Sequence, residues 1–409
     1  MKQQVIIHIK ELLQVRSLPS APLKGNALKT IPKIEDAYLI LEDNTVVDFG
    51  AMEDFNAEAW THAERIDAKD RFVLPAFCDS HTHAVFAAYR EHEFRDRIQG
   101  LSYQEIASKG GGILNSALKI SSMSEAELLE RSLERVLSMQ KSGTGALEIK
   151  SGYGLDLANE LKLLRVIQQI KSKVDIPVKS TFLAAHALPS AYKNDKDAYV
   201  DMIVKEWVPE VVRENLADFV DIFVETGYFD IEDLEKIHDA VSNSGLKLKV
   251  HANQFSAFGA VPKACALNAL SVDHLEVMEK RDFQALKDSS TMATLLPACS
   301  FYLKIPYAPA RTLCEWDIPI ALASDFNPGS SPTHNLFFIW SLACIHMNLT
   351  PEEALNALTI NAAFAMGIQD THGAIFKGYR GKLILTEKAP SIAYFPYAFG
   401  DNHLFKMLN

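Results

Sequence analysis

Residues 73–83 read Val-Leu-Pro-Ala-Phe-Cys-Asp-Ser-His-Thr-His, an apolar run that leads directly into two histidines. The apolar part predicts a buried β-strand, and His81 and His83 follow it two residues apart. Because side chains alternate along extended chain, both imidazoles lie on one face, where their neutral nitrogens can bind one divalent metal. A His-x-His pair alone indicates a metal site and a purely structural pair of histidines equally well. The rest of the chain must therefore distinguish these two interpretations.

Seven more short apolar runs follow, and most of the segments between them are long enough for a helix. We predict strands at residues 72–79, 145–150, 178–185, 219–224, 246–251, 271–274, 292–296 and 319–323. Residues 125–142 and 158–171 carry apolar residues at the three- and four-residue spacing of amphipathic helices. Eight successive strand-then-helix units predict an α/β fold, a parallel (β/α)8 TIM-like barrel.

Both ends of the chain predict a second, smaller β domain. Residues 37–41 and 45–50 are apolar runs on either side of a Glu-Asp-Asn turn, and residues 383–386 and 392–394 look like strands that return to them. The predicted small domain is a discontinuous β-sandwich formed by residues 1–70 with 373–409. The predicted barrel domain, which carries the possible metal site, is formed by residues 71–372.

The composition argues against several classes of protein. The 409 residues carry a formal net charge of −11, which argues against a nucleic acid partner because phosphate binding needs clustered Lys and Arg. Five scattered cysteines without a Cys-x-x-Cys pair predict reduced thiols in a cytoplasmic protein. Residues 335–350 form the longest nearly uncharged stretch, shorter than the roughly 20 residues of a membrane span. We therefore expect a buried helix there and no membrane contact.

Polar residues recur where the predicted strands end, which is the face of a parallel barrel that carries active sites. They include Tyr153, His186, His251, Gln254, His274, Asp325, Asn327 and Ser330, with Gly329 between the last two. His251 and Asp325 complete a set of three imidazoles and one carboxylate with His81 and His83. This set suits one metal ion, Zn²⁺ or Fe²⁺/Fe³⁺, and a position left for water gives hydrolytic chemistry.

Several segments outside the histidine pair are unusual in combination. They read VLPAFCDSHTH, YREHEFRDRIQGLSYQEIASKGGGI, EIKSGYGLD, TFLAAHALP, HANQFS, SVDHLE and ASDFNPGSSP. Together, over residues 74–367, they resemble the imidazolonepropionase family of the amidohydrolase superfamily. The resemblance implies a hydrolase of histidine degradation that opens the cyclic amide C–N bond of 4-imidazolone-5-propanoate to give N-formimidoyl-L-glutamate. It also implies a homodimer.

The resemblance assigns roles to individual residues. It implies that the metal ligands are His81, His83, His251 and Asp325. It implies that the substrate contacts are Arg90, Tyr153, His186, Gln254 and Ser330. It implies that the product contacts are Tyr153, Asn327 and Gly329.

The chemistry of the residues agrees with a substrate that bears a carboxylate. A guanidinium can bind a carboxylate through two parallel hydrogen bonds, and Arg90 follows His83 on the loop that leaves the first strand. Without the resemblance, a surface Arg90 paired with Glu91 or Glu93 would be the better interpretation. Tyr153 lies in a Gly-Tyr-Gly turn, where it either contacts a ligand or packs on a neighbour.

Two residues are candidates for moving the proton that hydrolysis requires. Asp325 can bind metal and also accept a proton, because a carboxylate has two oxygens. His274 is the second candidate, and its alternative is a core histidine bonded to Asp273 or Glu276. Some barrel hydrolases have a glutamate base three residues after the fifth-strand histidine. Here that position is Gln254, whose amide can orient substrate or water but cannot remove a proton.

Three alternatives stay open from the residues themselves. The first alternative is a site with two metal ions, because binuclear relatives carry a lysine on the fourth strand that bridges two metals. Lys150 ends the second predicted strand, so we expect a structural role for Lys150 and a single metal ion. Another mononuclear amidohydrolase, such as a cyclic amidine or aminoazine deaminase, is the rival function. A non-catalytic barrel is the rival of a different class, and the retention of all four ligands argues against it.

Overall fold

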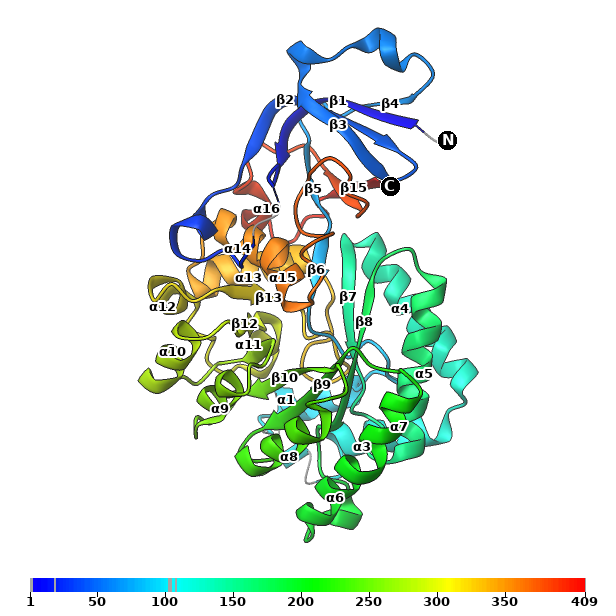
Figure 1. The fold of residues 1–409 in the computed structure, drawn as a ribbon, viewed down its shortest axis with the longest axis vertical. Helices are drawn as coiled ribbons and strands as arrows, with labels where there is room; N and C mark the ends of the chain where they lie inside the picture. The colour runs from blue at the N-terminus through cyan, green and yellow to red at the C-terminus, as the bar shows by residue number, and fades with distance from the viewer. Residues whose placement is uncertain (1–2, 18–19, 102–104, 107–108, 409) are drawn as a thin grey trace.

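The eight barrel strands form one parallel sheet in the computed structural model, in which neighbours in sequence are neighbours in space (Figure 1). The strands are β6 (Phe77–Asp79), β7 (Thr144–Lys150), β8 (Val178–Ala185), β9 (Phe219–Val224), β10 (Lys247–Ala252), β11 (Ser271–His274), β12 (Met292–Leu295) and β13 (Ile320–Leu322). The structure describes residues 3–17, 20–101, 105–106 and 109–408. The predicted (β/α)8 barrel is confirmed.

The barrel closes at its carboxyl rim, beyond the ends of its first and last strands. Thr82 and Phe326 form a parallel β-bridge there. The Asp325 N–H donates to the His81 carbonyl (3.0 Å), and the His83 N–H donates to the Phe326 carbonyl (2.8 Å). The backbone bonds that close the barrel therefore also hold the two histidines beside the aspartate.

Helices follow the strands and cover the outside of the barrel (Figure 1). They are α1 (Glu91–Ile98), α3 (Gly112–Ser122), α4 (Glu125–Lys141), α5 (Leu157–Lys173), α6 (Lys196–Met202), α7 (Val208–Arg213), α8 (Ile231–Val241), α9 (Ala260–Ala266), α10 (Lys280–Lys287), α11 (Pro297–Leu303), α12 (Ala310–Glu315), α13 (Leu336–Met347), α14 (Pro351–Leu358), α15 (Ile360–Ala365) and α16 (Tyr394–Tyr397). Shorter turns are η1 (Gly25–Lys29), η2 (Met52–Asp54), η3 (Ala57–Trp60), η4 (Ser190–Tyr192) and the π-helical η5 (Ile203–Trp207).

Local sequence explains where the two predicted amphipathic helices begin. Ser124 and Glu127 form a capping box at the start of α4, and the Asp156 carboxylate accepts from the Asn159 N–H at the start of α5. The apolar stretch at residues 335–350 forms the buried helix α13, as predicted. Among the described residues, none of the helices has the length and apolar character that crossing a membrane requires.

The prediction of a single strand over residues 72–79 is wrong. Residues Phe72–Pro75 form β5 in the small domain, and the barrel strand β6 starts only at Phe77. The hydrogen-bond partners change at this point: the Ala76 N–H donates to the Lys382 carbonyl, whereas the Phe77 N–H donates to the Gly143 carbonyl. One apolar run therefore serves two sheets, and the partners that divide it are remote in sequence.

The small domain is built from both ends of the chain (Figure 1). Its strands are β1 (Gln3–Leu13), β2 (Lys33–Glu42), β3 (Thr45–Ala51), β4 (Glu64–Asp67), β5, β14 (Leu383–Thr386) and β15 (Leu404–Leu408). The predicted β-sandwich takes the form of one mixed seven-stranded sheet. Strand β1 bulges at His8 (φ 54°), so its first half pairs with β4 and its second half with β5.

The predicted strand at residues 392–394 is also wrong. These residues form a turn that enters α16, and the returning strand is β15. Two prolines, Pro390 and Pro396, flank the run and cannot donate to a β-ladder. The run instead delivers Phe395 to the core, where its ring lies 5.4 Å from Phe72 and 5.9 Å from Trp340. This packing outweighs the β-like pattern of the sequence.

Candidate active site

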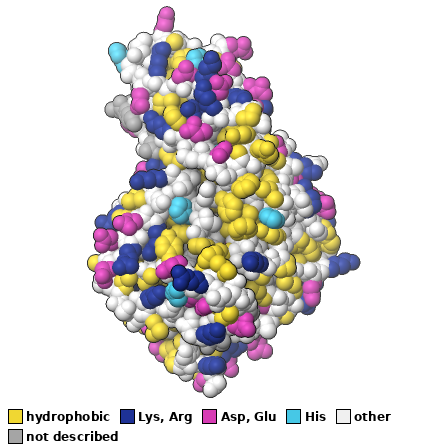
Figure 2. Space-filling model, turned by 180° about the vertical axis from the view of Figure 1, so that it is seen from behind, with side chains coloured by type: hydrophobic (Ala, Val, Ile, Leu, Met, Phe, Trp, Pro, Cys, Tyr) yellow, Lys and Arg dark blue, Asp and Glu magenta, His cyan; other side chains and the backbone are white. Residues whose placement is uncertain are grey.

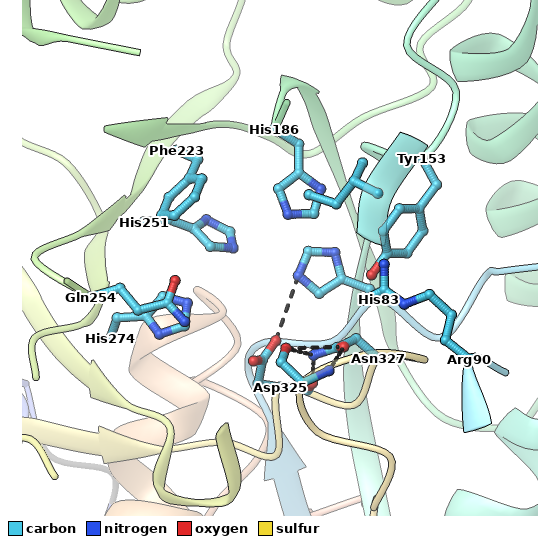
Figure 3. A pocket seen from close by; sticks show the side chains of 12 residues that line it. His83, Arg90, Tyr153, His186, Phe223, His251, Gln254, His274, Asp325 and Asn327 are labelled. Carbon is cyan, nitrogen blue, oxygen red and sulfur yellow. Dashed lines mark hydrogen bonds and ion pairs between the residues drawn. The ribbon is translucent and has the colours of Figure 1, made fainter. Parts of the chain in front are cut away.

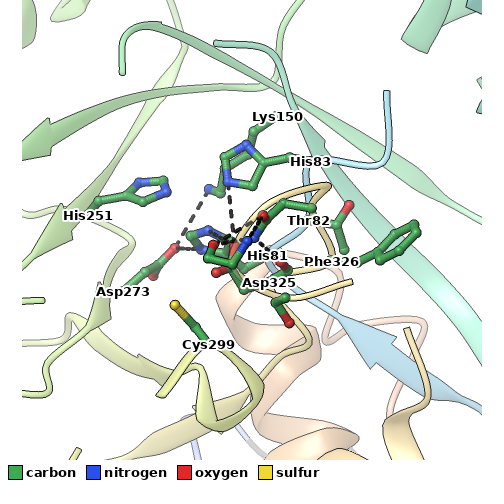
Figure 4. A network of polar contacts seen from close by, with 12 residues as sticks. His81, Thr82, His83, Lys150, His251, Asp273, Cys299, Asp325 and Phe326 are labelled. Carbon is green, nitrogen blue, oxygen red and sulfur yellow. Dashed lines mark hydrogen bonds and ion pairs between the residues drawn. The ribbon is translucent and has the colours of Figure 1, made fainter. Parts of the chain in front are cut away.

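The four predicted metal ligands converge inside the carboxyl rim of the barrel (Figure 4). His81 and His83 follow β6, His251 lies on β10, and Asp325 follows β13. Asp325 Oδ1 lies 3.6 Å from the Nε2 atoms of both His81 and His83. The rings of His81 and His251 lie 4.5 Å apart. All four side chains are buried.

Two further carboxylates lie beside two of these rings, and Asp273 fixes the orientation of His81 by a hydrogen bond. His81 Nδ1 donates to Asp273 Oδ2 at 2.6 Å, and Asp221 Oδ2 lies 3.0 Å from His251 Nδ1. The Nε2 atoms of His81 and His251 are buried without a hydrogen-bond partner. An unsatisfied buried nitrogen is costly, and a carboxylate behind an imidazole is the usual support of a metal ligand. The residues present therefore fit a metal ion.

The electrostatics of the cluster keep its imidazoles neutral. Burial, followed by the nearby Lys150 ammonium or other imidazoles, lowers the pKa values of His81, His83 and His251 well below their ordinary range. Burial raises the pKa of Asp325 to about 6, against the opposing effect of His274. Neutral imidazoles are the form that binds metal, so no proton has to leave these three rings at neutral pH.

The backbone at the rim is held in left-handed conformations that side chains rarely adopt. Asp325 has φ 50° and His274 has φ 90°, at or just beyond the ends of their strands. Such residues cost about 1–3 kcal/mol each and persist where the surrounding structure imposes them. Here the turns direct both side chains into the mouth of the barrel.

A network of buried charges lies within the barrel beneath the cluster (Figure 4). Lys150 Nζ lies 2.6 Å from Glu148 Oε1 and 2.8 Å from Asp221 Oδ2. Lys249 Nζ pairs with Glu148 and donates to the Ser80 carbonyl at 2.9 Å. Lys150 is thus engaged by two carboxylates and supports Asp221, which faces His251. The structural role expected for Lys150 agrees with these contacts.

Sequence reasoning missed most of this network, although a signal for it exists. Glu148 and Lys150 are two residues apart on β7, and Lys249 and His251 are two residues apart on β10. Each pair therefore shares the inward face of its strand. A charged residue two positions from a proposed ligand on the same strand points to the same face of the sheet. Such a residue predicts a buried polar network around the metal ligands.

A pocket opens above the cluster and brings the predicted substrate residues together (Figure 3). The predicted residues that line it are His83, Arg90, Tyr153, His186, His251, Gln254, His274, Asp325, Asn327 and Ser330. Phe223 at the end of β9 and Ile113 at the start of α3 complete the wall and were not predicted. The two apolar side chains flank a site that is otherwise polar.

Arg90 is buried and lines this pocket, so it is not a surface residue. Only 3% of it is exposed, and its Nε and Nη1 atoms lack a hydrogen-bond partner. Glu93 Oε2 lies 3.5 Å from Nε, while Glu91 is exposed. A Cβ atom on Gly329 would lie 1.2 Å from Arg90 Nη2. Gly329, predicted as a product contact, therefore provides the space that the guanidinium occupies.

Buried hydrogen bonds hold the turn that carries Tyr153. The Glu160 carboxylate accepts from the N–H groups of Gly152 (3.1 Å) and Gly154 (2.6 Å). His186 Nδ1 lies 3.1 Å from the Gly152 carbonyl, so this nitrogen donates and Nε2 stays free as an acceptor. The His186 ring stacks on His83 at 5.0 Å. The turn and the ring thus form one rigid wall.

The loop after β13 is braced by its own asparagine. Asn327 Oδ1 accepts from the N–H groups of Gly329 (2.9 Å) and Ser330 (2.7 Å). Its Nδ2 donates to the Asp325 carbonyl at 2.6 Å. Asn327 therefore shapes the loop that presents Asp325 and Ser330 to the pocket.

His274 forms the hydrogen bond to Glu276 that its alternative interpretation expected, and it also lines the pocket. Glu276 Oε1 lies 3.4 Å from His274 Nδ1, whereas Asp273 bonds His81. Burial works to lower the pKa of His274, but the Glu276, Asp325 and Asp273 carboxylates together outweigh it and raise that pKa above its ordinary value. On the same side of the pocket, Gln254 Nε2 donates to Cys299 Sγ at 3.3 Å. Cys299 is another residue that sequence reasoning missed.

The chain is similar to known proteins over almost its whole length. The Amidohydrolase family model matches residues 125–394. An imidazolonepropionase from Christiangramia forsetii is 50% identical over 98% of this chain and 97% of its own. One from Flavobacterium johnsoniae is 49% identical over 97% and 96%. The solved structure of Escherichia coli guanine deaminase has a TM-score of 0.72 and covers 100% of this chain and 97% of its own, at 12% identity. That last likeness shows the fold alone.

Proposed function

The chain belongs to the amidohydrolase family, and we propose that it hydrolyses the cyclic amide C–N bond of 4-imidazolone-5-propanoate to N-formimidoyl-L-glutamate. The observation that carries this proposal is one pocket that joins the His-and-Asp cluster to a buried guanidinium. Arg90 has unpaired donors there, and a substrate carboxylate would satisfy them. The imidazolonepropionase relatives, which share 49–50% of their sequence with this chain, support the same substrate.

His81, His83, His251 and Asp325 would hold a single divalent cation, and their donor atoms suit zinc or iron. When bound, the cation supplies Lewis-acid chemistry that polarises a carbonyl oxygen and makes water a better nucleophile. Asp273 keeps the His81 ring in the tautomer that presents Nε2 to this position, and Asp221 lies 3.0 Å from His251 Nδ1.

The walls of the pocket position the substrate. Arg90 binds the propionate, at a distance from the scissile bond. Tyr153 and His186, on the wall held by the Gly152 carbonyl and Glu160, contact the ring and its substituents. Ser330 and Asn327 approach from the loop after β13. Phe223 and Ile113 exclude water from one side of the ring.

Proton transfer falls to Asp325 and His274. A C–O bond forms to the ring carbonyl carbon, the C–N bond breaks, and one proton of the attacking water passes to the departing nitrogen. Asp325 has two carboxylate oxygens, so it can bind a cation and also take this proton, and His274 faces the same pocket. Gln254 has an amide that cannot take a proton and orients the reactants instead.

The function is tested by turnover of 4-imidazolone-5-propanoate with product identification. Formation of N-formimidoyl-L-glutamate without ammonia supports the proposal. Release of ammonia without ring opening, or turnover of guanine or cytosine in preference, would establish the rival deaminase instead. The solved deaminase structures share the fold at low identity and do not favour that rival.

We further propose that the chain forms a homodimer through an apolar surface near the junction of the two domains. Hydrophobic side chains gather on this face in Figure 2. Helices α11, α13 and α16 and the nearby C-terminal segment expose large apolar side chains, namely Phe301, Ile345, Tyr397, Phe399 and Phe405. Sedimentation of Tyr397→Asp tests this: a monomer is expected, and an unchanged dimer would place the interface elsewhere.

A further inference from the structure

Three side chains beside the principal cluster form a second group of potential metal ligands. His274 ends β11, Glu276 follows it, and Cys299 lies on α11. One ligand atom from each lies within 4.8 Å of the others, and all three residues are buried. In Figure 4 the Cys299 thiol points from α11 toward the polar cluster. A buried thiol, imidazole and carboxylate at this spacing are a donor set for a transition metal.

The separation of two ligand atoms of the group, which also form a hydrogen bond, matches the edge of a tetrahedral zinc site. Zinc binds nitrogen and oxygen at 2.0–2.2 Å and sulfur at 2.3 Å, which separates neighbouring ligand atoms by about 3.3–3.6 Å. His274 Nδ1 lies 3.4 Å from Glu276 Oε1. The other oxygen of Glu276, Oε2, is buried without a hydrogen-bond partner. A buried carboxylate oxygen needs a partner, and a bound cation would provide one.

Burial and the nearby Asp325 and Glu276 carboxylates raise the pKa of the Cys299 thiol well above its usual range, so a cation has to displace the thiol proton when it binds. Gln254 Nε2 donates to Cys299 Sγ at 3.3 Å, and such a bond strengthens when the acceptor is an anion. The Ser300 hydroxyl donates to Glu276 Oε1 at 3.1 Å and holds that carboxylate in place. Loss of the thiol proton to solvent would leave two negative charges, which a divalent cation neutralises.

We propose that His274, Glu276 and Cys299 bind a second, thiophilic divalent cation such as Zn²⁺, and that this cation inhibits the enzyme. His274 belongs to both groups, because one of its ring nitrogens also lies within 4.8 Å of the ligand atoms of His81 and His251. A cation on His274 Nδ1 removes the ring from proton transfer. The site itself is independent of the proposed function, whereas the inhibition rests on the proton-transfer role of His274.

Cobalt titration of the metal-depleted full chain tests the site directly. Cobalt bound to imidazole and carboxylate alone shows only its weak visible bands, whereas a thiolate ligand adds a strong charge-transfer band in the near ultraviolet. We expect this band with the second equivalent of cobalt and not with the first. In Cys299→Ala it should disappear, while the visible bands of the first equivalent remain. Cys314→Ala, a buried thiol elsewhere, is the matched control and should keep the band.

Glu276→Gln is the second variant and should weaken binding of the second equivalent at least several-fold while keeping the band at saturation. A wild-type protein without the band, a band that arrives with the first equivalent, or a band that survives in Cys299→Ala would each overturn the site. In activity assays, a second equivalent of Zn²⁺ should lower wild-type turnover on the order of 100-fold, the contribution of a positioned general acid or base. Each variant is compared with its own rate at one equivalent. Binding of the second cation without inhibition would overturn the proton-transfer role of His274, whereas the proposed metal site would still hold.

Discussion

Gly329→Ala should weaken substrate binding by displacing Arg90. The added Cβ would lie 1.2 Å from Arg90 Nη2 and 2.1 Å from its Cζ atom. The guanidinium must then move by roughly 2 Å, because non-bonded heavy atoms settle near 3.5 Å. Gly329 has no positive φ, so the backbone itself accepts alanine. The damage therefore falls on the position of Arg90.

The size of the effect follows from the hydrogen bonds that would be lost. A hydrogen bond to a charged group contributes about 1.5–3 kcal/mol, and about 1.4 kcal/mol corresponds to a tenfold change. Loss of one such bond to the substrate carboxylate lowers kcat/KM by about 10- to 100-fold. Because the propionate lies away from the bond that breaks, most of the change should appear in KM.

A double-mutant cycle with Arg90→Ala decides whether the effect passes through Arg90. Steady-state kinetics on 4-imidazolone-5-propanoate should show that Gly329→Ala adds nothing to Arg90→Ala, because the two changes remove the same interaction. Gly400→Ala, where a Cβ meets nothing within 4 Å, is the control and should match the wild type. Additive losses, or a Gly329→Ala variant with normal KM, would refute the reasoning.

Three further predictions concern the metal cluster and the charges beneath it. Asp273→Asn removes the carboxylate that accepts the His81 hydrogen bond and should weaken metal affinity by about 10- to 100-fold in a chelator competition. An unchanged affinity would show that Asp273 does not support His81 as a metal ligand. Lys150→Met removes the ammonium that pairs with Asp221 and Glu148, of which only Glu148 keeps a second partner in Lys249, and should destabilise the fold by about 3–5 kcal/mol in denaturant titration; a stability equal to the wild type would contradict the proposed support. In the metal-free protein, the lowered pKa values of His81, His83 and His251 mean that the unfolded chain binds more protons at these three rings below about pH 6.5, so Tm should fall as the pH drops from 7 to 5. The raised pKa of Asp325, about 6, opposes only part of this fall, and a Tm that rises toward pH 5 would contradict the net effect of the three rings.

Local patterns along the chain predicted the barrel well. The strands β8, β9 and β11 coincide with apolar runs bounded by turns, and their order follows because parallel strands joined by helices take neighbouring places. The split at Ala76 could not be predicted in this way. The split depends on the Lys382 and Gly143 carbonyls, which are remote in sequence and accept hydrogen bonds from adjacent residues of the same extended run.

The candidate site was predictable to the extent that it lies at strand ends. His251 and Asp325 follow from that rule, and the structure places them beside His81 and His83. Cys299 lies on α11, off the strand ends, so no strand pattern predicted its place beside Gln254. The same holds for the space that Gly329 leaves for Arg90, which only three-dimensional packing reveals.

The most direct test of a metal-dependent ring hydrolase is one titration of metal-depleted protein with Zn²⁺ or Fe²⁺, with turnover of 4-imidazolone-5-propanoate measured at each point. We predict that activity is absent without metal and rises linearly to a maximum at one equivalent per chain. In a parallel titration, His83→Ala should bind metal weakly and stay inactive. Ring opening at full rate in the metal-free protein, or a maximum that requires two equivalents, would contradict a single metal held by His81, His83, His251 and Asp325.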